Sequence, residues 1–289
     1  MFYLLFCSLI WAFSYGLIKG NLTSLSPDFV AWARMFMPFV LFLPFLKVSS
    51  FSGKKIAYFL LIGAVQYGIM YLLVIRSYAY LDAYQIIVFT ACTPIYVTLI
   101  GDLFSKSFKP FYLFTALMAL LGVLFLYQCS FKGSEFFKGV VLVQLADICF
   151  AFGQVAYKQE RKKDSKIKDL NLYALLFLGG SLVTCLSTTV FQGWGSFSLI
   201  SLKQGVLLIY LGAIASGLCF FWWNKFAVLI HSGTLAVFNN VKIPLGVFVS
   251  WIVFGEEVSV FYVALSGILV GLALFLAERH SKKEMRISI

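Results

Sequence analysis

Charged residues are scarce in this sequence, and their scarcity excludes a water-soluble domain. Only 12% of the 289 residues are Asp, Glu, Lys or Arg, whereas 61% are hydrophobic, and the mean hydropathy is +0.93. Soluble domains are on average about half apolar and about a quarter charged. The sequence therefore predicts an integral membrane protein, whose apolar side chains are covered partly by lipid.

Histidine and clustered cysteine are also scarce, which argues against metal chemistry and hydrolysis. The two histidines, His231 and His280, lie near the ends of apolar runs. The six cysteines lie in or beside apolar runs and show no CxxC or Cys/His spacing that holds zinc. We predict no catalytic residue, no metal and no cofactor.

Long apolar runs make up most of the chain. Ten of them are bounded by charged residues, Gly, Pro or Ser, and a spanning helix needs about 20 such residues. The runs cover residues 2–18, 29–45, 56–74, 80–103, 111–127, 139–157, 170–191, 205–224, 234–254 and 259–277. Loops of about eight residues remain, too short for a soluble catalytic or ATP-binding domain.

Basic residues are distributed unevenly between the two ends of these runs. With a cytoplasmic N-terminus, 16 Lys and Arg residues face inward, 5 face outward and 2 lie within spans, which accounts for all 23. Such an excess on cytoplasmic loops sets orientation. We therefore predict both termini in the cytoplasm, in a bacterial-type cell inner membrane. No nucleic-acid binding is predicted, because the longest basic stretch, residues 158–168, is a short loop that also carries acidic residues.

Two weak internal echoes divide the chain into halves. An offset of 150 aligns Pro94 in the fourth run with Pro244 in the ninth, and an offset of 139 aligns Trp11–Lys19 with Phe150–Lys158. Five spans per half place the second half upside down relative to the first. Secondary transporters are commonly built this way, with the substrate near the midplane between the halves.

The predicted fold is therefore all-α and membrane-embedded, with ten transmembrane helices arranged as two inverted five-helix repeats. The first repeat covers residues 1–130 and the second covers residues 131–289, which includes a short basic tail.

Several short motifs resemble the EamA-type family of the drug/metabolite transporter superfamily. The segment Leu9–Ser14 (LIWAFS) with Lys19 is similar to the first-span pattern of that family, and Phe221–Lys225 (FWWNK) is similar to its eighth-span ending. Pro244 followed by Gly255-Glu256 resembles its ninth-span signature. Arg34 in the second span also fits.

The resemblance extends from Trp11 to about Leu276 and departs from the family at one point. The first half does not repeat the Gly-Glu pair at the corresponding spacing after Pro94, although Gly101-Asp102 lies nearby. The resemblance implies ten spans in two inverted repeats and alternating access without ATP hydrolysis, and it implies no substrate.

Two charged residues lie near the middle of their runs, where a charge costs at least about 2.5 kcal/mol. Asp147 lies in the sixth run and Lys242 in the ninth. Gln144 and Gln154 share a helical face with Asp147, and Asn239 precedes Lys242 by three residues. These five residues are the principal candidates for substrate binding.

Asp147 and Lys242 allow two interpretations. They can pair with each other as a buried structural bridge, or they can bind a substrate. In the second interpretation Asp147 meets a cationic group and Lys242 meets a carboxylate, which favours a zwitterion. Asp147 is alternatively the carrier of a coupling proton.

Further candidates are weaker. Arg34, toward the outer third of its span, is either a structural tie or a ligand contact. Gln66 and Tyr67 lie near the middle of the third span and either line a pocket or join helices. Trp11 and Trp223 can stack on an aromatic or cationic substrate, or they pack like most aromatics of this chain.

Prolines and small residues mark special helix geometry. Pro94 and Pro244 cannot donate to the carbonyls of Thr90 and Asn240, so we expect each helix to break or bend there. The segment Gly267–Gly271 is a small-xxx-small motif, which allows close helix packing within the chain or in a homodimer.

These features predict a secondary transporter of a small metabolite. The favoured substrate is an amino acid or a zwitterionic derivative such as S-adenosylmethionine, moved by alternating access with a coupling proton or a counter-substrate. One alternative is an exporter of drugs or nucleotide-type metabolites, and another is a non-transporting scaffold subunit. An enzyme acting on lipid-linked substrates is disfavoured, because Glu256-Glu257 is the only acidic pair that could serve it.

Overall fold

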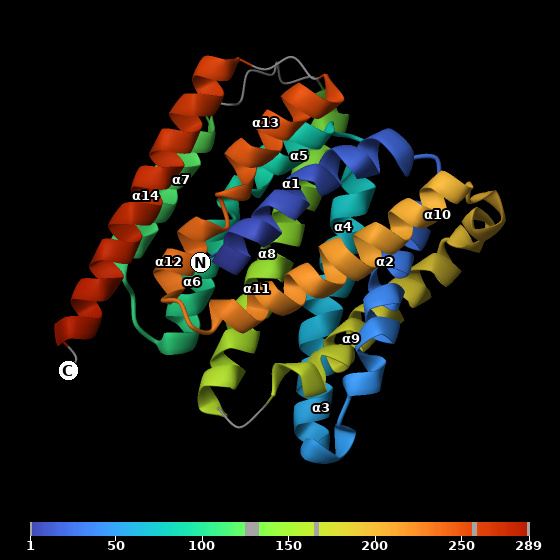
Figure 1. Cartoon of the computed structure of the whole chain (residues 1–289), viewed down its shortest axis with the longest axis horizontal. Helices are drawn as coiled ribbons and strands as arrows, with labels where there is room; N and C mark the ends of the chain where they lie inside the picture. The colour runs from blue at the N-terminus through green and yellow to red at the C-terminus, as the bar shows by residue number, and fades with distance from the viewer. Residues whose placement is uncertain (1, 125–132, 165–167, 256–258, 288–289) are drawn as a thin grey trace.

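The computed structural model describes residues 2–124, 133–164, 168–255 and 259–287, and the elements of this part of the chain are all helical (Figure 1). Up to residue 124 the α-helices are α1 (Phe2–Asn21), α2 (Pro27–Phe42), α3 (Gly53–Gly63), α4 (Met70–Ser77), α5 (Ala83–Phe89), α6 (Thr93–Ser105) and α7 (Pro110–Leu124). The others are α8 (Gly133–Lys163), α9 (Asp169–Val190), α10 (Leu202–Ile209), α11 (Cys219–Ala227), α12 (Ser232–Phe238), α13 (Lys242–Phe254) and α14 (Val260–Ile287).

Nine helical stretches in the described ranges are long and apolar enough to cross a membrane. This finding confirms the prediction of an all-α, multi-pass membrane protein. The predicted fifth span differs from the others, because its apolar helix covers only Pro110–Val123, and residues 125–127 lie outside the described residues. The number of ten spans therefore stays a prediction.

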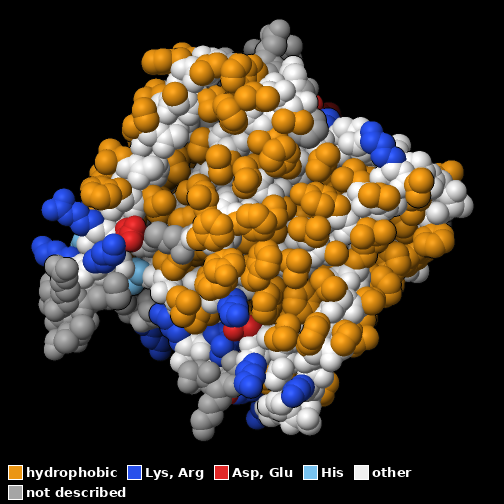
Figure 2. All heavy atoms as spheres, in the orientation of Figure 1, with side chains coloured by type: hydrophobic (Ala, Val, Ile, Leu, Met, Phe, Trp, Pro, Cys, Tyr) orange, Lys and Arg blue, Asp and Glu red, His pale blue; other side chains and the backbone are white. Residues whose placement is uncertain are grey.

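The surface matches a protein immersed in lipid. Figure 2 shows a broad apolar area over the body of the helices, with most Lys and Arg side chains on the visible face gathered along its lower and left margins. Large apolar side chains of the described residues are highly exposed, including Leu202 at 87% and Phe261 at 70%. Such exposure in water would be an aggregation hazard, whereas in a bilayer it costs nothing.

Local sequence signals set several helix starts. Ser201 begins α10 with a capping box, in which its hydroxyl accepts from the Gln204 backbone and the Gln204 side chain accepts from the Ser201 backbone, at 3.3 Å and 3.0 Å. Asp82 and Gln85 form the same arrangement at the start of α5. Short 3₁₀ turns, η1 (Leu43–Phe45), η2 (Val48–Ser50) and η5 (Gly193–Leu199), lie in connections between helices.

The fourth and ninth apolar runs are each divided into two helices. The fourth consists of α5, the 3₁₀ turn η4 (Thr90–Cys92) and α6, with Pro94 at the second residue of α6. The Thr93 hydroxyl donates to the Thr90 carbonyl at 2.6 Å, which satisfies the acceptor that Pro94 cannot serve.

In the ninth run, residues 239–241 separate α12 from α13, and Pro244 is the third residue of α13. The Asn240 carbonyl accepts from the Ile243 backbone at 3.1 Å, so this carbonyl, like that of Thr90, has a donor although the proline cannot supply one. The Asn240 side chain donates to the Ala91 carbonyl at 3.1 Å. The two interruptions therefore meet, with α12 packed on α6 and α13 packed on α5.

The third and eighth apolar runs each contain a π-helical segment. These segments are η3 (Ala64–Ile69), between α3 and α4, and η6 (Tyr210–Leu218), between α10 and α11. A π-helical turn widens the helix and changes which side chains point inward, and it is frequent at functional sites. Both segments lie next to the site described below.

Glycines allow α3 and α9 to approach very closely. A Cβ atom added at Gly63 would lie 1.8 Å from the Leu176 carbonyl oxygen, and one at Gly179 would lie 2.1 Å from the Leu60 carbonyl oxygen. Such approach of two backbones through small residues is typical of membrane helices. Gly267–Gly271 on α14 is different, because a Cβ at Gly271 would meet nothing within 4 Å and one at Gly267 would only touch Pro244 at 4.0 Å. This motif does not serve close packing among the described residues, and the homodimer stays a prediction.

We predict that Gly63→Ala destabilises the protein, because the added methyl group must push the α9 backbone away. The expected loss of unfolding free energy is about 1–3 kcal/mol, measured as a lower Tm of the detergent-purified protein. Gly101→Ala in α6 is the control, since its Cβ would meet nothing within 4 Å. Equal Tm values for the two variants would contradict the close approach of α3 and α9.

Candidate functional site

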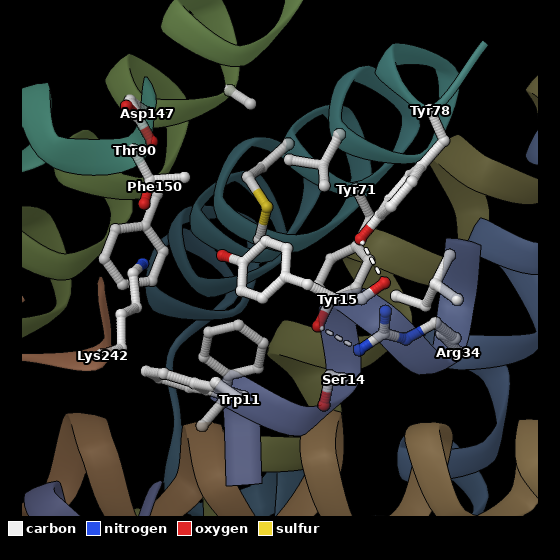
Figure 3. A pocket seen from close by; sticks show the side chains of 15 residues that line it. Trp11, Ser14, Tyr15, Arg34, Tyr71, Tyr78, Thr90, Asp147, Phe150 and Lys242 are labelled. Atoms are coloured by element: carbon white, nitrogen blue, oxygen red, sulfur yellow. Dashed lines mark hydrogen bonds between the residues drawn. The ribbon is translucent and has the colours of Figure 1, made fainter. Parts of the chain in front are cut away.

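A cavity of about 610 Å³, a volume that includes the open space at its mouth, lies among α1, α2, α4, α8, α11 and α13. Its walls combine aromatic rings with a few polar groups (Figure 3). The lining residues are Trp11, Ser14, Tyr15, Ile18, Arg34, Met70, Tyr71, Val74, Tyr78, Thr90, Ala146, Asp147, Phe150, Phe220 and Lys242.

Lys242 brings a buried positive charge to this cavity. It is the first residue of α13, immediately after the interruption of the ninth run, and it is 8% exposed. Its ammonium lies 5.9 Å from the centre of the Trp11 ring and 5.7 Å from that of Phe150. No hydrogen bond or ion pair joins it to another described residue. Because a helix N-terminus is itself positive, this position attracts anions.

Asp147 brings a negative charge from the middle of α8. Its side chain is buried, and its Oδ2 atom has no hydrogen-bond partner among the described residues. No contact of 4.0 Å or less joins its carboxylate to the Lys242 ammonium. The structural bridge considered from the sequence is therefore not formed in this structure, although both groups line one cavity.

Arg34 contributes a second positive charge from α2. Its guanidinium donates to the Ser216 hydroxyl at 3.1 Å and 3.3 Å and to the Tyr71 hydroxyl at 3.0 Å, and it lies 4.4 Å from the centre of the Tyr71 ring. Ser216 belongs to the π-helical segment η6. These partners are neutral, so Arg34 is oriented without being neutralised.

By formal charge, the cavity is therefore lined by two cationic side chains and one carboxylate. Figure 3 shows two groups of side chains on opposite sides of the Tyr15 ring, Asp147 and Lys242 on one side and Arg34 on the other. Since the described residues supply no second carboxylate to this cavity, the excess charge is positive. A bound anion would balance it, whereas a zwitterion would not.

Trp11 forms one wall of the cavity and is held rigidly. Its indole N–H donates to the Ala215 carbonyl in η6 at 2.8 Å. Trp223 packs behind it, with ring centres 4.9 Å apart, and is fully buried. Trp223 supports the wall without lining the cavity.

The predicted polar residues outside the cavity bond to one another or to the backbone. Gln144 donates to the Phe89 carbonyl at 2.9 Å and accepts from the Tyr96 hydroxyl at 3.0 Å. Asn239 donates to Gln154 at 3.3 Å. These bonds join α8 to its neighbours, although Gln154 Nε2 and Asn239 Oδ1 have no hydrogen-bond partner among the described residues.

Gln66 and Tyr67 belong to a second polar network between η3, α9 and α11. Gln66 lies 3.5 Å from Asn224, which donates to the Tyr67 hydroxyl at 2.9 Å. That hydroxyl also lies 3.0 Å from the Tyr173 hydroxyl. This network holds helices together, as interhelical hydrogen bonds do in membranes.

Several lining residues were not predicted from the sequence. Ser14 and Tyr15 follow Trp11 by three and four residues, so the helical period could have placed them on its face. Phe150 follows Asp147 by three residues in the same way. Tyr71 follows the candidate Tyr67 by four residues, but Tyr67 itself does not line the cavity, and Thr90 carries no such signal.

We predict that Lys242→Met has little effect on stability, because no bond of its ammonium is broken and the two side chains are similar in volume. The expected cost is at most about 1.5 kcal/mol, whereas breaking a buried bridge would cost about 3–5 kcal/mol. Thermal unfolding of the purified variant measures the difference. Lys158→Met is the comparison, because the buried Lys158 ammonium donates to the Ile230 carbonyl and its loss should lower the Tm further. A loss of unfolding free energy of about 3–5 kcal/mol in Lys242→Met, as expected for a broken buried bridge, would contradict this description.

Comparison with known proteins places the chain in a family. A model of the EamA-like transporter family matches residues 1–128. The chain is 32% identical to a probable biotin transporter of Pseudomonas aeruginosa, over 99% of this chain and 100% of that protein. It is also 32% identical to the biotin transporter of Escherichia coli K12, over 88% of this chain and 85% of that protein.

A solved crystal structure shares the fold, with a TM-score of 0.74, 14% identity and coverage of 96% of this chain and 95% of the other. The family match and the two biotin transporters confirm the prediction that the protein is a transporter and not an enzyme. Because such similarity spans nearly the whole chain, the protein belongs to the EamA-like transporter family and is a multi-pass secondary transporter.

Proposed function

We propose that the protein transports biotin across the bacterial inner membrane. Biotin is a monocarboxylate with an alkyl chain and an uncharged bicyclic ring that contains a cyclic urea. The observation that carries the proposal is the charge of the cavity, where Lys242 and Arg34 outnumber Asp147. One bound carboxylate would balance that charge. The 32% identity to biotin transporters over most of the chain supports the same substrate.

Lys242 is the proposed partner of the biotin carboxylate. Its ammonium is buried and lacks a protein partner, so a ligand anion would satisfy it without breaking an existing bond. Trp11 and Phe150 flank it and offer apolar area to the alkyl chain and the thioether ring. Arg34, already oriented by Ser216 and Tyr71, adds positive potential from the other side of the Tyr15 ring.

The cavity argues against the substrates that the sequence favoured. An amino acid has no net charge and would leave the excess positive charge unbalanced. S-adenosylmethionine carries a net positive charge and would increase it. The zwitterion was inferred from Asp147 and Lys242 alone, before Arg34 was known to share their cavity. A lipophilic cationic drug is disfavoured for the same reason.

We further propose transport by alternating access of two inverted five-helix repeats, residues 1–130 and 131–289, with ten spans and cytoplasmic termini. The boundary between the repeats lies outside the described residues, as does Glu256 of the ninth-span motif. Two pairs of matching irregularities support the repeat. The fourth and ninth runs are both interrupted, and the third and eighth both contain π-helical segments. A coupling proton or a counter-substrate would drive the cycle.

Lys19 and Lys158, which correspond at the offset of 139 residues, also support the repeat. Lys19 donates to the Tyr78 and Leu81 carbonyls at 3.0 Å each, in the turn before the interrupted fourth run. Lys158 donates to the Ile230 carbonyl, in the turn before the interrupted ninth run. Each lysine therefore ties the first helix of its repeat to the same point of that repeat.

We predict that purified protein in proteoliposomes takes up labelled biotin and that Lys242→Met reduces uptake about 10- to 100-fold, because a charge-assisted hydrogen bond is lost. Lys242→Arg, which keeps the charge, should retain more activity than Lys242→Met. Lys225→Met, exposed on α11, is the matched control and should behave as wild type. Biotin uptake no greater than in empty liposomes, or equal uptake in all variants, would overturn the proposal.

A further inference from the structure

We infer that Asp147 is the residue that recognises the ureido ring of the substrate, by accepting its N–H groups. The inference rests on the proposed transport of biotin and adds a specificity-determining residue to that site. It concerns the end of the ligand opposite the carboxylate.

The first observation is that the Asp147 carboxylate is short of donors. Its Oδ2 atom is buried and has no hydrogen-bond partner among the described residues. Of the neighbouring hydroxyl groups, that of Thr90 donates its single proton to the Ile87 carbonyl at 2.7 Å. The Thr93 hydroxyl donates to the Thr90 carbonyl at 2.6 Å and also interacts with the Asp147 side chain, but Oδ2 of that carboxylate is left without a donor.

The second observation is that Asp147 faces the cavity. It lies on its wall together with Thr90 and Phe150, as Figure 3 shows. A buried acceptor without a donor is costly, and native structures normally satisfy such groups. A carboxylate aimed into a binding cavity therefore fits a ligand that presents N–H groups.

Biotin has N–H donors at one place only, the cyclic urea, whose two nitrogens each carry one hydrogen. The rest of the molecule is a thioether ring, an alkyl chain and a carboxylate, none of which can donate to Asp147. Because Lys242 attracts the carboxylate and Asp147 attracts the N–H groups, the two residues would fix the direction of the bound ligand. A simple fatty acid satisfies Lys242 and leaves Asp147 unpaired, so the site should reject it.

This role makes a distinctive prediction for 2-iminobiotin, in which a cyclic guanidine replaces the urea and carries a positive charge at neutral pH. Its N–H groups would meet Asp147 through charge-assisted hydrogen bonds, which are stronger than neutral ones. Replacing Asp147 by Asn keeps an acceptor oxygen and removes the charge. The variant should therefore lose far more affinity for 2-iminobiotin than for biotin.

The experiment is competition against labelled biotin in biotin-loaded proteoliposomes, where exchange needs no driving gradient. The competitors are unlabelled biotin, 2-iminobiotin, desthiobiotin, which keeps the urea, and octanoate. Wild type is compared with Asp147→Asn and with Asp147→Glu, which keeps the charge. Glu135→Gln is the matched control, because Glu135 lies on the same helix with its side chain 62% exposed. Size-exclusion chromatography confirms that each variant is folded.

We expect wild type to bind both biotin and 2-iminobiotin, the latter more weakly because its zero net charge leaves the excess positive charge of the cavity unbalanced, and to exclude octanoate. Asp147→Asn should shift the ratio of the half-inhibition concentrations of 2-iminobiotin and biotin about 10- to 100-fold against 2-iminobiotin, while Asp147→Glu and Glu135→Gln should keep the wild-type ratio. The half-inhibition concentration of desthiobiotin should change in parallel with that of biotin in every variant.

Other outcomes separate the inference from the proposed function. If Asp147→Asn weakens the binding of all competitors by the same factor, or leaves the ratio of the half-inhibition concentrations of 2-iminobiotin and biotin unchanged, Asp147 does not recognise the ureido ring. The proposal of biotin transport would still stand. If Asp147→Asn abolishes gradient-driven uptake but leaves exchange and its selectivity intact, the residue carries a proton instead, and the inference fails. If wild type does not exchange biotin at all, both the inference and the proposed function fail.

Discussion

The site depends on one electrostatic constraint, which is that a charge held inside a membrane protein needs a partner. Lys242 has none among the described residues, and Arg34 has only the neutral hydroxyl groups of Ser216 and Tyr71. One carboxylate, that of Asp147, cannot balance both cations. The proposed anionic substrate would complete this charge distribution, which links the local chemistry of the cavity to the class of solute that we propose the protein carries.

Helix irregularities supply the geometry that this constraint requires. The interruption of the ninth run ends at Lys242, so the side chain enters the cavity from the first residue of α13. The π-helical segment η6 (Tyr210–Leu218) presents Ser216 to Arg34 and the Ala215 carbonyl to Trp11. Ordinary α-helices would use those groups differently, because the carbonyls would bond within the helix and the faces would point elsewhere. The irregular segments therefore position the charged and aromatic groups.

Most of the helical fold could be predicted from the sequence, because long apolar runs and the asymmetry of Lys and Arg are direct consequences of the bilayer. Asp147 and Lys242 could also be found, since a charge in an apolar run is conspicuous. The partners of Gln144 and Asn239 could not, because they come from backbone and side chains of distant helices. The role of Arg34 was underestimated for the same reason. Only the folded chain shows that it shares a cavity with Lys242, which changes the expected ligand from a zwitterion to an anion.

The most direct measurement is the equilibrium binding of biotin and of its primary amide to the purified protein by isothermal titration calorimetry. The two ligands have the same ring and chain, and they differ only in the negative charge at the end of the chain. A cavity with excess positive charge predicts that biotin binds and that the amide binds at least about tenfold more weakly. Equal affinities would contradict the central claim that the unpaired cations of this cavity select an anionic substrate.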